Sequence, residues 1–241
     1  MKILVVIPYW DGDRVQAETT ALLAGDLLEK RSESVSLCFL HRMDSQQPRP
    51  KVVDKAMEKF DKVLVRRCGR SGSGFPHGCN EMAYFILAWP AHDPKLFKDF
   101  DATLILESDC VFTRKNWDTE LVEEWVRCVA AGKTICGNII HNGFGGYPRH
   151  VNAASLFGKE ISILAAGPLR GGPADIGWDY YHGRNLDPIA YDSPIFFLDY
   201  RKATITPREL FAPRKMGLSP LVYHGVKDSS AVQAVRDRYH V

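Results

Sequence analysis

The stretch that most constrains this chain is residues 104–112, Leu-Ile-Leu-Glu-Ser-Asp-Cys-Val-Phe. An apolar run there ends in two carboxylates one residue apart, Glu107 and Asp109. Such a run is typical of a buried strand in a parallel sheet, and open α/β sheets bind ligands at the carboxyl ends of their strands. Paired carboxylates at that edge suit a divalent cation with a phosphorylated ligand behind it. The alternative is a pair of solvated acids that cap the next helix.

The rest of the chain alternates between strand-like and helix-like segments. Apolar runs predict strands at residues 2–7, 35–40, 62–65, 134–140, 151–157 and 195–200. Apolar periodicity predicts helices at residues 18–29, 53–60, 81–89, 118–130, 159–166 and 229–239. This order predicts an α/β fold with a mostly parallel sheet. Because no linker interrupts the sequence, we expect a single domain over residues 1–241, with a nucleotide-binding half at 1–112 and a more irregular half at 113–241.

The composition is that of an ordinary globular protein and argues against disorder. Of the 241 residues, 45% are hydrophobic and 25% are charged, and the net charge of +2 neither requires nor excludes an anionic partner. No apolar run approaches the ~18 residues that span a bilayer, and the N-terminal apolar run is too short for a signal peptide. Six cysteines without a C-x-x-C pair indicate reduced thiols. We therefore expect a cytoplasmic protein without a membrane span or a structural zinc site.

A basic, glycine-rich segment at residues 66–80 precedes the predicted helix at 81–89. Backbone N–H groups at such a helix start can bind phosphate, and Arg70 and His77 are its candidate phosphate contacts. The segment does not match the phosphate loop of P-loop proteins, and no dinucleotide fingerprint follows the first strand. The alternative for this segment is a plain surface loop.

Four short motifs stand in a familiar order along the chain. The first predicted strand ends in Ile-Pro-Tyr-Trp-Asp-Gly-Asp-Arg, the central one in Glu107-Ser-Asp109, and Gly177-Trp-Asp-Tyr180 and Tyr223-His-Gly-Val-Lys-Asp228 follow. Together they resemble a glycosyltransferase of the GT-A fold, over nearly the whole chain. The chain departs from the usual Asp-x-Asp of that family at Glu107. The resemblance implies a Rossmann-like, mixed and mostly parallel sheet flanked by helices, with a donor half at 1–112 and an acceptor half at 113–241.

The resemblance also implies a nucleoside-diphosphate sugar donor, such as a UDP-sugar, and Mn²⁺ or Mg²⁺ as cofactor. Carried over onto this sequence, Asp109 and His224 would bind the metal, Glu107 would bind the metal or the ribose, and Lys227 would contact a phosphate. An imidazole beside carboxylates favours Mn²⁺, and a bound cation would stabilise the diphosphate that leaves. The remaining donor-binding candidates are Pro8, Tyr9, Asp11, Arg70 and Ser108. For Tyr9 the alternative is core filling, and for Lys227 a solvated lysine.

The resemblance also implies that Asp179 would occupy the position of the catalytic base in inverting members of the family. It lies between Trp178 and Tyr180, whose rings would desolvate it and raise its pKa, which makes a better base. Asp175 is the nearby rival, and in a retaining enzyme Asp179 would only bind the acceptor. The alternative is that the rings belong to the core and Asp179 caps a turn. The candidate acceptor contacts are Trp178, Asp179, His141 and Asn142.

Two other functional classes stay open at this point. Metal-dependent nucleotidyltransferases also combine α/β folds with paired acids, and a non-catalytic protein could bind a nucleotide sugar or nucleic acid. A basic run from Arg201 to Lys215, with Arg236 and Arg238, could face duplex DNA, although a solvated basic face is the alternative. Some compact bacteriophage enzymes of the GT-A type glycosylate hydroxymethylated pyrimidines in DNA, so such an acceptor is one hypothesis. Nothing in the sequence indicates an obligate protein partner.

Overall fold

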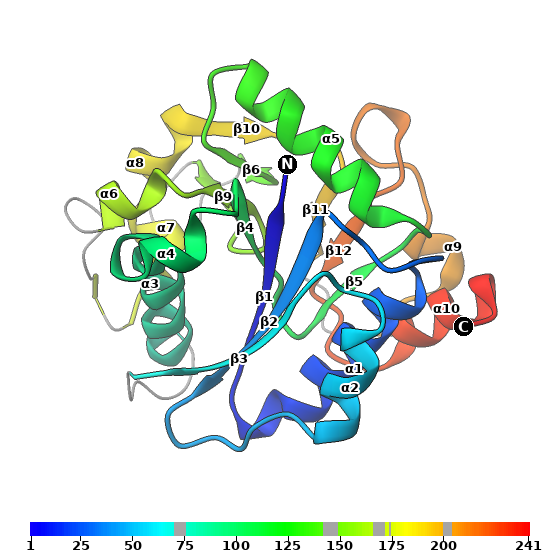
Figure 1. The fold of residues 1–241 in the computed structure, drawn as a ribbon. Helices are drawn as coiled ribbons and strands as arrows, with labels where there is room; N and C mark the ends of the chain where they lie inside the picture. The colour runs from blue at the N-terminus through cyan, green and yellow to red at the C-terminus, as the bar shows by residue number, and fades with distance from the viewer. Residues whose placement is uncertain (70–75, 142–148, 166–171, 174, 200–203) are drawn as a thin grey trace.

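The computed structural model describes residues 1–69, 76–141, 149–165, 172–173, 175–199 and 204–241. A central sheet lies between two layers of helices (Figure 1). Its seven strands run in the order β10 (Ala190–Asp192), β6 (Ile135–Gly137), β9 (Leu156–Gly158), β4 (Ala102–Ile105), β1 (Ile3–Tyr9), β2 (Val35–Arg42) and β3 (Val63–Cys68). All pairs are parallel except those of β9, which runs antiparallel to β4 and β6. The predicted mixed, mostly parallel α/β sheet is confirmed.

Alternating side chains of β1 belong to two separate hydrophobic cores on opposite faces of the sheet. Ile3, Val5 and Ile7 pack with α1 (Arg14–Asp26), α2 (Pro50–Met57), α5 (Trp117–Ala130) and α10 (Ser230–Tyr239). Leu4 and Val6 pack on the opposite face with α3 (His77–His92), α4 (Pro94–Phe97) and α6 (Ile161–Ala165). Successive strand residues point to opposite faces, so a strand that is apolar throughout must be covered on both sides. Each fully buried aliphatic side chain contributes about 1.5–3 kcal/mol to folding.

A second, three-stranded sheet joins the C-terminal part of the chain to the middle. Its order is β11 (Phe196–Leu198), β12 (Val222–His224) and β5 (Cys110–Phe112). Strands β12 and β5 are antiparallel, and their register sets His224 opposite Cys110. Both sheets therefore combine strands from before and after residue 112, the position at which the sequence suggested a division into halves.

Two predicted strands are each divided in the structure. The segment predicted at 134–140 forms β6 and the short β7 (Ile139–Ile140), and that at 151–157 forms β8 (His150–Val151) and β9. The break in the second has a local cause. The Asn152 side chain accepts a hydrogen bond from Ala154 N (3.2 Å), and Ser155 Oγ donates one to Asn152 O (2.6 Å). Such side-chain bonds to the backbone compete with strand pairing.

Short helical segments complete the described chain. They are η1 (Asp11–Asp13), α7 (Trp178–Tyr181), α8 (Gly183–Leu186), η2 (Asp187–Ile189), α9 (Pro207–Leu210) and η3 (Lys215–Gly217). A capping box of Thr206 and Glu209 fixes the start of α9. Within the described residues, every helix is too short or too polar to cross a bilayer.

Candidate active site

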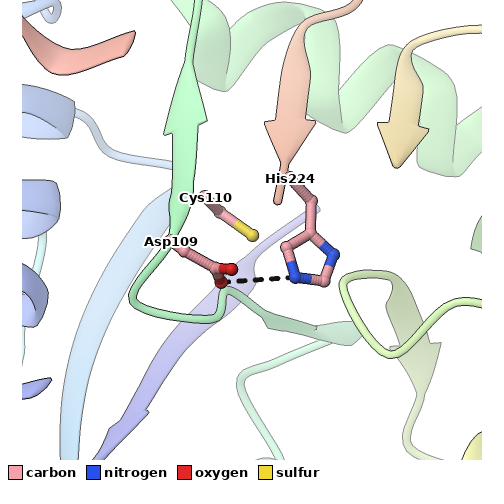
Figure 2. A group of neighbouring side chains, drawn as sticks. All are labelled: Asp109, Cys110 and His224. Atoms are coloured by element: carbon pink, nitrogen blue, oxygen red, sulfur yellow. Dashed lines mark ion pairs between the residues drawn. The ribbon is translucent and has the colours of Figure 1, made fainter. Parts of the chain in front are cut away.

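The loop between β4 and β5 meets the end of β12 at one point. Because β12 pairs with β5, the imidazole of His224 lies over the two carboxylates of that loop. Its Nε2 is 2.7 Å from Glu107 Oε2 and 3.3 Å from Asp109 Oδ1. Figure 2 shows the Asp109 carboxylate, in the turn just before β5, and the His224 ring, at the end of β12, pointing toward each other with the Cys110 sulfur beside them. The structure thus brings together the carboxylates and the histidine that the sequence singled out.

The turn after His224 places Lys227 next to the Asp109 carboxylate. Gly225 N donates to Asp109 O (3.3 Å), and Lys227 Nζ forms an ion pair with Asp109 Oδ2. Gly225 has a φ of +116°, in the region that L side chains avoid. A residue with a Cβ would not allow this turn, so glycine is required for Lys227 to reach Asp109.

The charges of this cluster stabilise one another. Burial raises the pKa of Asp109, but the hydrogen bond and charge of His224 and the charge of Lys227 outweigh it and hold that pKa well below its usual range. Burial lowers the pKa of His224, but Glu107 and Asp109 overcome this effect and raise it to about 10. In the same way Asp109 raises the pKa of Lys227 against the effect of burial. At neutral pH the cluster therefore holds a charged imidazolium between carboxylates.

The donor atoms of this cluster fit a hard divalent cation. Within the part of the chain that the structure describes, Asp109 Oδ2 is buried without a hydrogen-bond partner and has only its ion pair with Lys227 Nζ. One ligand atom from each of Asp109, Cys110 and His224 lies within 4.8 Å of the others. Burial raises the pKa of the Cys110 thiol well above its usual value, so this sulfur stays protonated and is a poor ligand. Asp109, His224 and Glu107 then offer an oxygen-rich set with one imidazole, which suits Mn²⁺ or Mg²⁺.

A cavity of about 560 Å³ opens beside the cluster. Besides Glu107, Asp109, His224 and Lys227, its walls include Trp10, Asp13, Arg42, Asn80, Asn152, Trp178, Asp179, Tyr180, Leu198 and Asp199. A cavity of this size falls in the range of small-molecule sites. The aromatic rings, carboxylates and cations together offer contacts for a base, a phosphate and a sugar.

Asp179 lies at the cavity wall in the first turn of α7. It is buried, and burial together with the charge of Glu107 raises its pKa to about 7. Tyr180 N donates a hydrogen bond to its Oδ1 (3.1 Å). Such a carboxylate accepts a proton readily near neutral pH. Asp175, the alternative base, is exposed and does not line the cavity.

Two buried asparagines that the sequence did not indicate also line the cavity. Asn80 in α3 holds the segment that leads into α7. Its Nδ2 donates to Ile176 O (2.7 Å), and its Oδ1 accepts from Trp178 N (2.8 Å). Asn152 accepts a hydrogen bond at 2.9 Å from His224 Nδ1. Both contacts join segments far apart in the sequence, so no local pattern reveals them.

The prediction that Tyr9 binds the donor is wrong, and the structure shows the alternative, core filling. Its ring is fully buried in the core, and its hydroxyl donates to Gln46 O (3.0 Å), so it cannot stack on a base. The next residue, Trp10, is 46% exposed and lines the cavity. Its ring lies 5.8 Å from the Arg42 guanidinium. Because neighbouring residues at the end of a strand point to opposite faces, Tyr9 enters the core and Trp10 the site.

Other predicted donor contacts lie outside the cavity wall. Pro8 pairs with Leu40 inside the sheet, and Asp11 Oδ1 accepts a hydrogen bond from Gln46 N (2.7 Å). Ser108 O accepts one from Thr20 Oγ1 (2.9 Å). The backbone of these residues shapes the loops next to the site, while their side chains do not line it.

The predicted acceptor residues divide in the same way. Trp178 and Asp179 line the cavity, whereas His141 is exposed and lies 3.6 Å from Asp192 Oδ2, outside the cavity wall. His77 is exposed at the start of α3 and is likewise absent from that wall. Arg70 and Asn142 lie outside the described residues.

Three residues of the predicted basic face make contacts within the protein itself. The Arg214 guanidinium lies 4.8 Å from the centre of the Phe197 ring and donates to Glu209 O (2.8 Å). Lys215 forms an ion pair with Asp192. The Arg238 guanidinium lies 4.1 Å from the centre of the Phe211 ring. Arg201 and Lys202 lie outside the described residues.

Comparison with known proteins relates the fold to solved glycosyltransferases. No family profile and no curated protein matches this sequence. Mouse xyloside xylosyltransferase 1 in its apo form is similar with a TM-score of 0.58 and 13% identity, over 95% of this chain and 99% of that one. A glycosyltransferase involved in the glycosylation of the major capsid of PBCV-1 gives 0.50 and 13%, over 100% of both chains. The bifunctional glycosyltransferase WbbM gives 0.57 and 9%, over 97% of this chain and 49% of that one. At these identities the likeness establishes the fold, which is the GT-A-like α/β fold that these glycosyltransferases share.

Proposed function

We propose that this chain is a metal-dependent glycosyltransferase that moves a sugar from a nucleoside-diphosphate sugar to an acceptor hydroxyl. The observation that carries the proposal is the meeting of Asp109, Glu107, His224 and Lys227 at the wall of the cavity. These side chains come from two distant parts of the chain. They supply two kinds of group that a diphosphate needs, namely ligands for a cation and a lysine for a phosphate oxygen.

Within this proposal each side chain has a defined role. Asp109 and His224 hold the divalent cation, and Glu107 holds the cation or the donor ribose. The cation, when bound, stabilises the negative charge that develops on the departing diphosphate. Lys227 is exposed enough to exchange its ion pair with Asp109 for a phosphate. Trp10 replaces Tyr9 as the ring on which the base stacks, and uracil in a UDP-sugar is the base we propose.

The proton of the acceptor hydroxyl goes to Asp179. Its carboxylate is buried at the cavity wall, and its pKa of about 7 leaves a large fraction ionised at neutral pH. Attack by the acceptor hydroxyl on the anomeric carbon forms the new C–O bond while the bond to the diphosphate breaks. In-line displacement of this kind inverts the anomeric configuration. The configuration of the product, read from its anomeric proton coupling, tests this assignment.

For the acceptor we propose a hydroxyl carried by a sugar-like ring. Trp178 and Tyr180 flank Asp179 in the sequence and line the cavity with it, and aromatic faces suit the apolar face of such a ring. The hypothesis of a duplex-DNA acceptor has weaker support, because Arg214, Lys215 and Arg238 are engaged within the protein. A fall in duplex affinity with rising salt would restore that hypothesis.

Calorimetry with UDP, with and without Mn²⁺, is the first test. We expect binding that needs Mn²⁺ and disappears with a chelator. Asp109→Asn should abolish the Mn²⁺-dependent binding of UDP and the slow hydrolysis of nucleotide sugars. Asp237→Asn, which alters an exposed carboxylate on α10 that accepts from Gln233 Nε2 (2.6 Å), is the matched control and should leave both unchanged.

A screen of nucleotide sugars for hydrolysis then separates the alternatives. Release of a nucleoside diphosphate supports glycosyl transfer. Release of pyrophosphate from nucleoside triphosphates would instead support a nucleotidyltransferase. Metal-dependent UDP binding without turnover of any nucleotide sugar would support a non-catalytic binding protein.

A further inference from the structure

We propose that Asn152 is a positioning residue that fixes the orientation and the tautomer of His224 for metal binding. The inference rests on the proposed function and deepens it, because it concerns how the metal ligand is prepared. Asn152 lies in the turn between β8 and β9 and is buried at the wall of the cavity. No pattern in the sequence pointed to this residue.

The amide of Asn152 can face His224 in only one way. Its Oδ1 accepts a hydrogen bond from Ala154 N at 3.2 Å and lies 2.9 Å from His224 Nδ1. The backbone N–H of Ala154 is always a donor, so the side-chain atom that faces it must be the oxygen rather than the NH₂ group. The atom that faces His224 Nδ1 is that same oxygen.

The tautomer of His224 follows from this assignment. An amide oxygen is only an acceptor, so Nδ1 of His224 must carry a proton. The other ring nitrogen, Nε2, then faces Glu107 Oε2 at 2.7 Å and Asp109 Oδ1 at 3.3 Å. When its proton leaves, Nε2 presents a lone pair toward the carboxylates, as a ligand must. A hydrogen bond to the second ring nitrogen is the usual way in which proteins orient a ligating histidine.

The turn holds Asn152 firmly in this position. Its backbone N–H donates to Asn138 O (3.0 Å), and its carbonyl accepts from Ser155 Oγ (2.6 Å). Its side chain and its main chain are thus both fixed, so the oxygen offered to His224 is preorganised.

Two isosteric substitutions separate the hydrogen bond from the shape of the side chain. Asn152→Leu keeps the volume and removes the acceptor, whereas Asn152→Asp keeps an acceptor toward both Ala154 N and His224 Nδ1. Free Mn²⁺, measured by electron paramagnetic resonance, gives the affinity without reference to activity. We expect Asn152→Leu to bind Mn²⁺ about 10- to 100-fold more weakly, and Asn152→Asp to bind it at least as tightly as the unaltered chain.

Two outcomes would overturn the role of Asn152 alone. One is an unchanged affinity in Asn152→Leu, and the other is an equal loss in Asn152→Leu and Asn152→Asp. Failure of the unaltered chain to bind Mn²⁺ would overturn the metal site itself, so the two failures are distinguishable. Melting curves of each variant establish that the measured protein is folded.

A second measurement needs no variant that might fail to fold. Nitrogen-15 shifts of His224 in the unaltered chain, taken with the diamagnetic ion Mg²⁺, report which ring nitrogen carries the proton. We expect a protonated Nδ1, with its proton protected from exchange by Asn152. A protonated Nε2 beside a bare Nδ1 would overturn the proposal.

Discussion

A Cβ added to Gly225 would lie 1.8 Å from the backbone oxygen of Asp199. The contact is this close because Asp199 N donates to His224 O at 2.8 Å, which draws the two segments together next to the site. The obstacle is backbone, which cannot rotate away as a side chain can. The residue that directly follows His224 therefore has no room for a side chain.

Gly225→Ala should destabilise the chain and weaken Mn²⁺ binding together. The clash and the positive φ would force the turn apart and displace His224, at a cost of at least about 3 kcal/mol in unfolding free energy. Gly132→Ala is the matched control, since Gly132 also has a positive φ of +70°, but no atom of the described residues lies within 4 Å of the added Cβ. It should cost only about 1 kcal/mol. Denaturant unfolding measures the loss of unfolding free energy in each variant. Equal losses in Gly225→Ala and Gly132→Ala would contradict the role of the Asp199 contact.

Asp179→Asn should abolish sugar transfer while leaving the affinity for UDP and Mn²⁺ unchanged. In the unaltered chain the base must be ionised, so the transfer rate should rise with pH and level off above about pH 7, the raised pKa of Asp179. A rate profile without an inflection between pH 6 and 8, or residual transfer in the variant, would remove Asp179 from the role of base.

Ionisation of Asp179 should raise the transfer rate but lower the stability of the fold. The pKa of Asp179 is raised from its ordinary value of 3.8 to about 7, so the folded state binds this proton more tightly than the unfolded state. Its contribution to stability is complete below about pH 4 and is lost as the pH rises through about 7. At pH 8, Asp179→Asn should thus be more stable than the unaltered chain, by on the order of 2–4 kcal/mol, while at pH 4 the two should be nearly equal. Urea unfolding at both pH values measures this difference.

Trp10→Ala should weaken UDP binding, whereas Tyr9→Phe should lower stability and leave UDP binding unchanged. Loss of the Trp10 ring should weaken UDP binding by about 1–3 kcal/mol, the usual worth of base stacking on an aromatic side chain. Tyr9→Phe removes only a buried hydroxyl that donates to Gln46 O. It should leave UDP affinity unchanged and cost about 1 kcal/mol of stability. Calorimetry and thermal melting give the two numbers, and weaker UDP binding in Tyr9→Phe would reverse our correction.

Asn80→Ala should slow sugar transfer without changing the affinity for UDP and Mn²⁺. The variant loses the hydrogen bonds to Ile176 O and Trp178 N that hold the start of α7, so Asp179 would no longer be held in place. We expect kcat to fall roughly 10- to 100-fold, in the range that misplaced catalytic groups cost. Asn80→Asp keeps the acceptor for Trp178 N and should retain more activity. Parallel losses of UDP affinity and kcat would instead indicate a general effect on folding.

The layered fold and one half of the site can be predicted from the order of the amino acids alone. Strand burial produces continuous apolar runs and helix burial a periodic pattern, and both are written in consecutive residues. Glu107 and Asp109 were found for the same reason, since they follow directly after a buried strand. The division of residues 151–157 was missed because it depends on the side chain of Asn152 turning back onto the backbone.

The other half of the site depends on contacts between segments that meet only in the folded chain. His224 meets the carboxylates through the register of β12 against β5, and Asn80 and Asn152 act across long stretches of sequence. The choice of Trp10 over Tyr9 depends on which face of a strand end the core covers, and a shift of one residue reverses it. Hydrogen bonds and pairings between distant segments leave no periodic trace in either segment. They exist only once the chain has folded, whereas the pattern of buried apolar residues has to be present beforehand for the chain to fold at all.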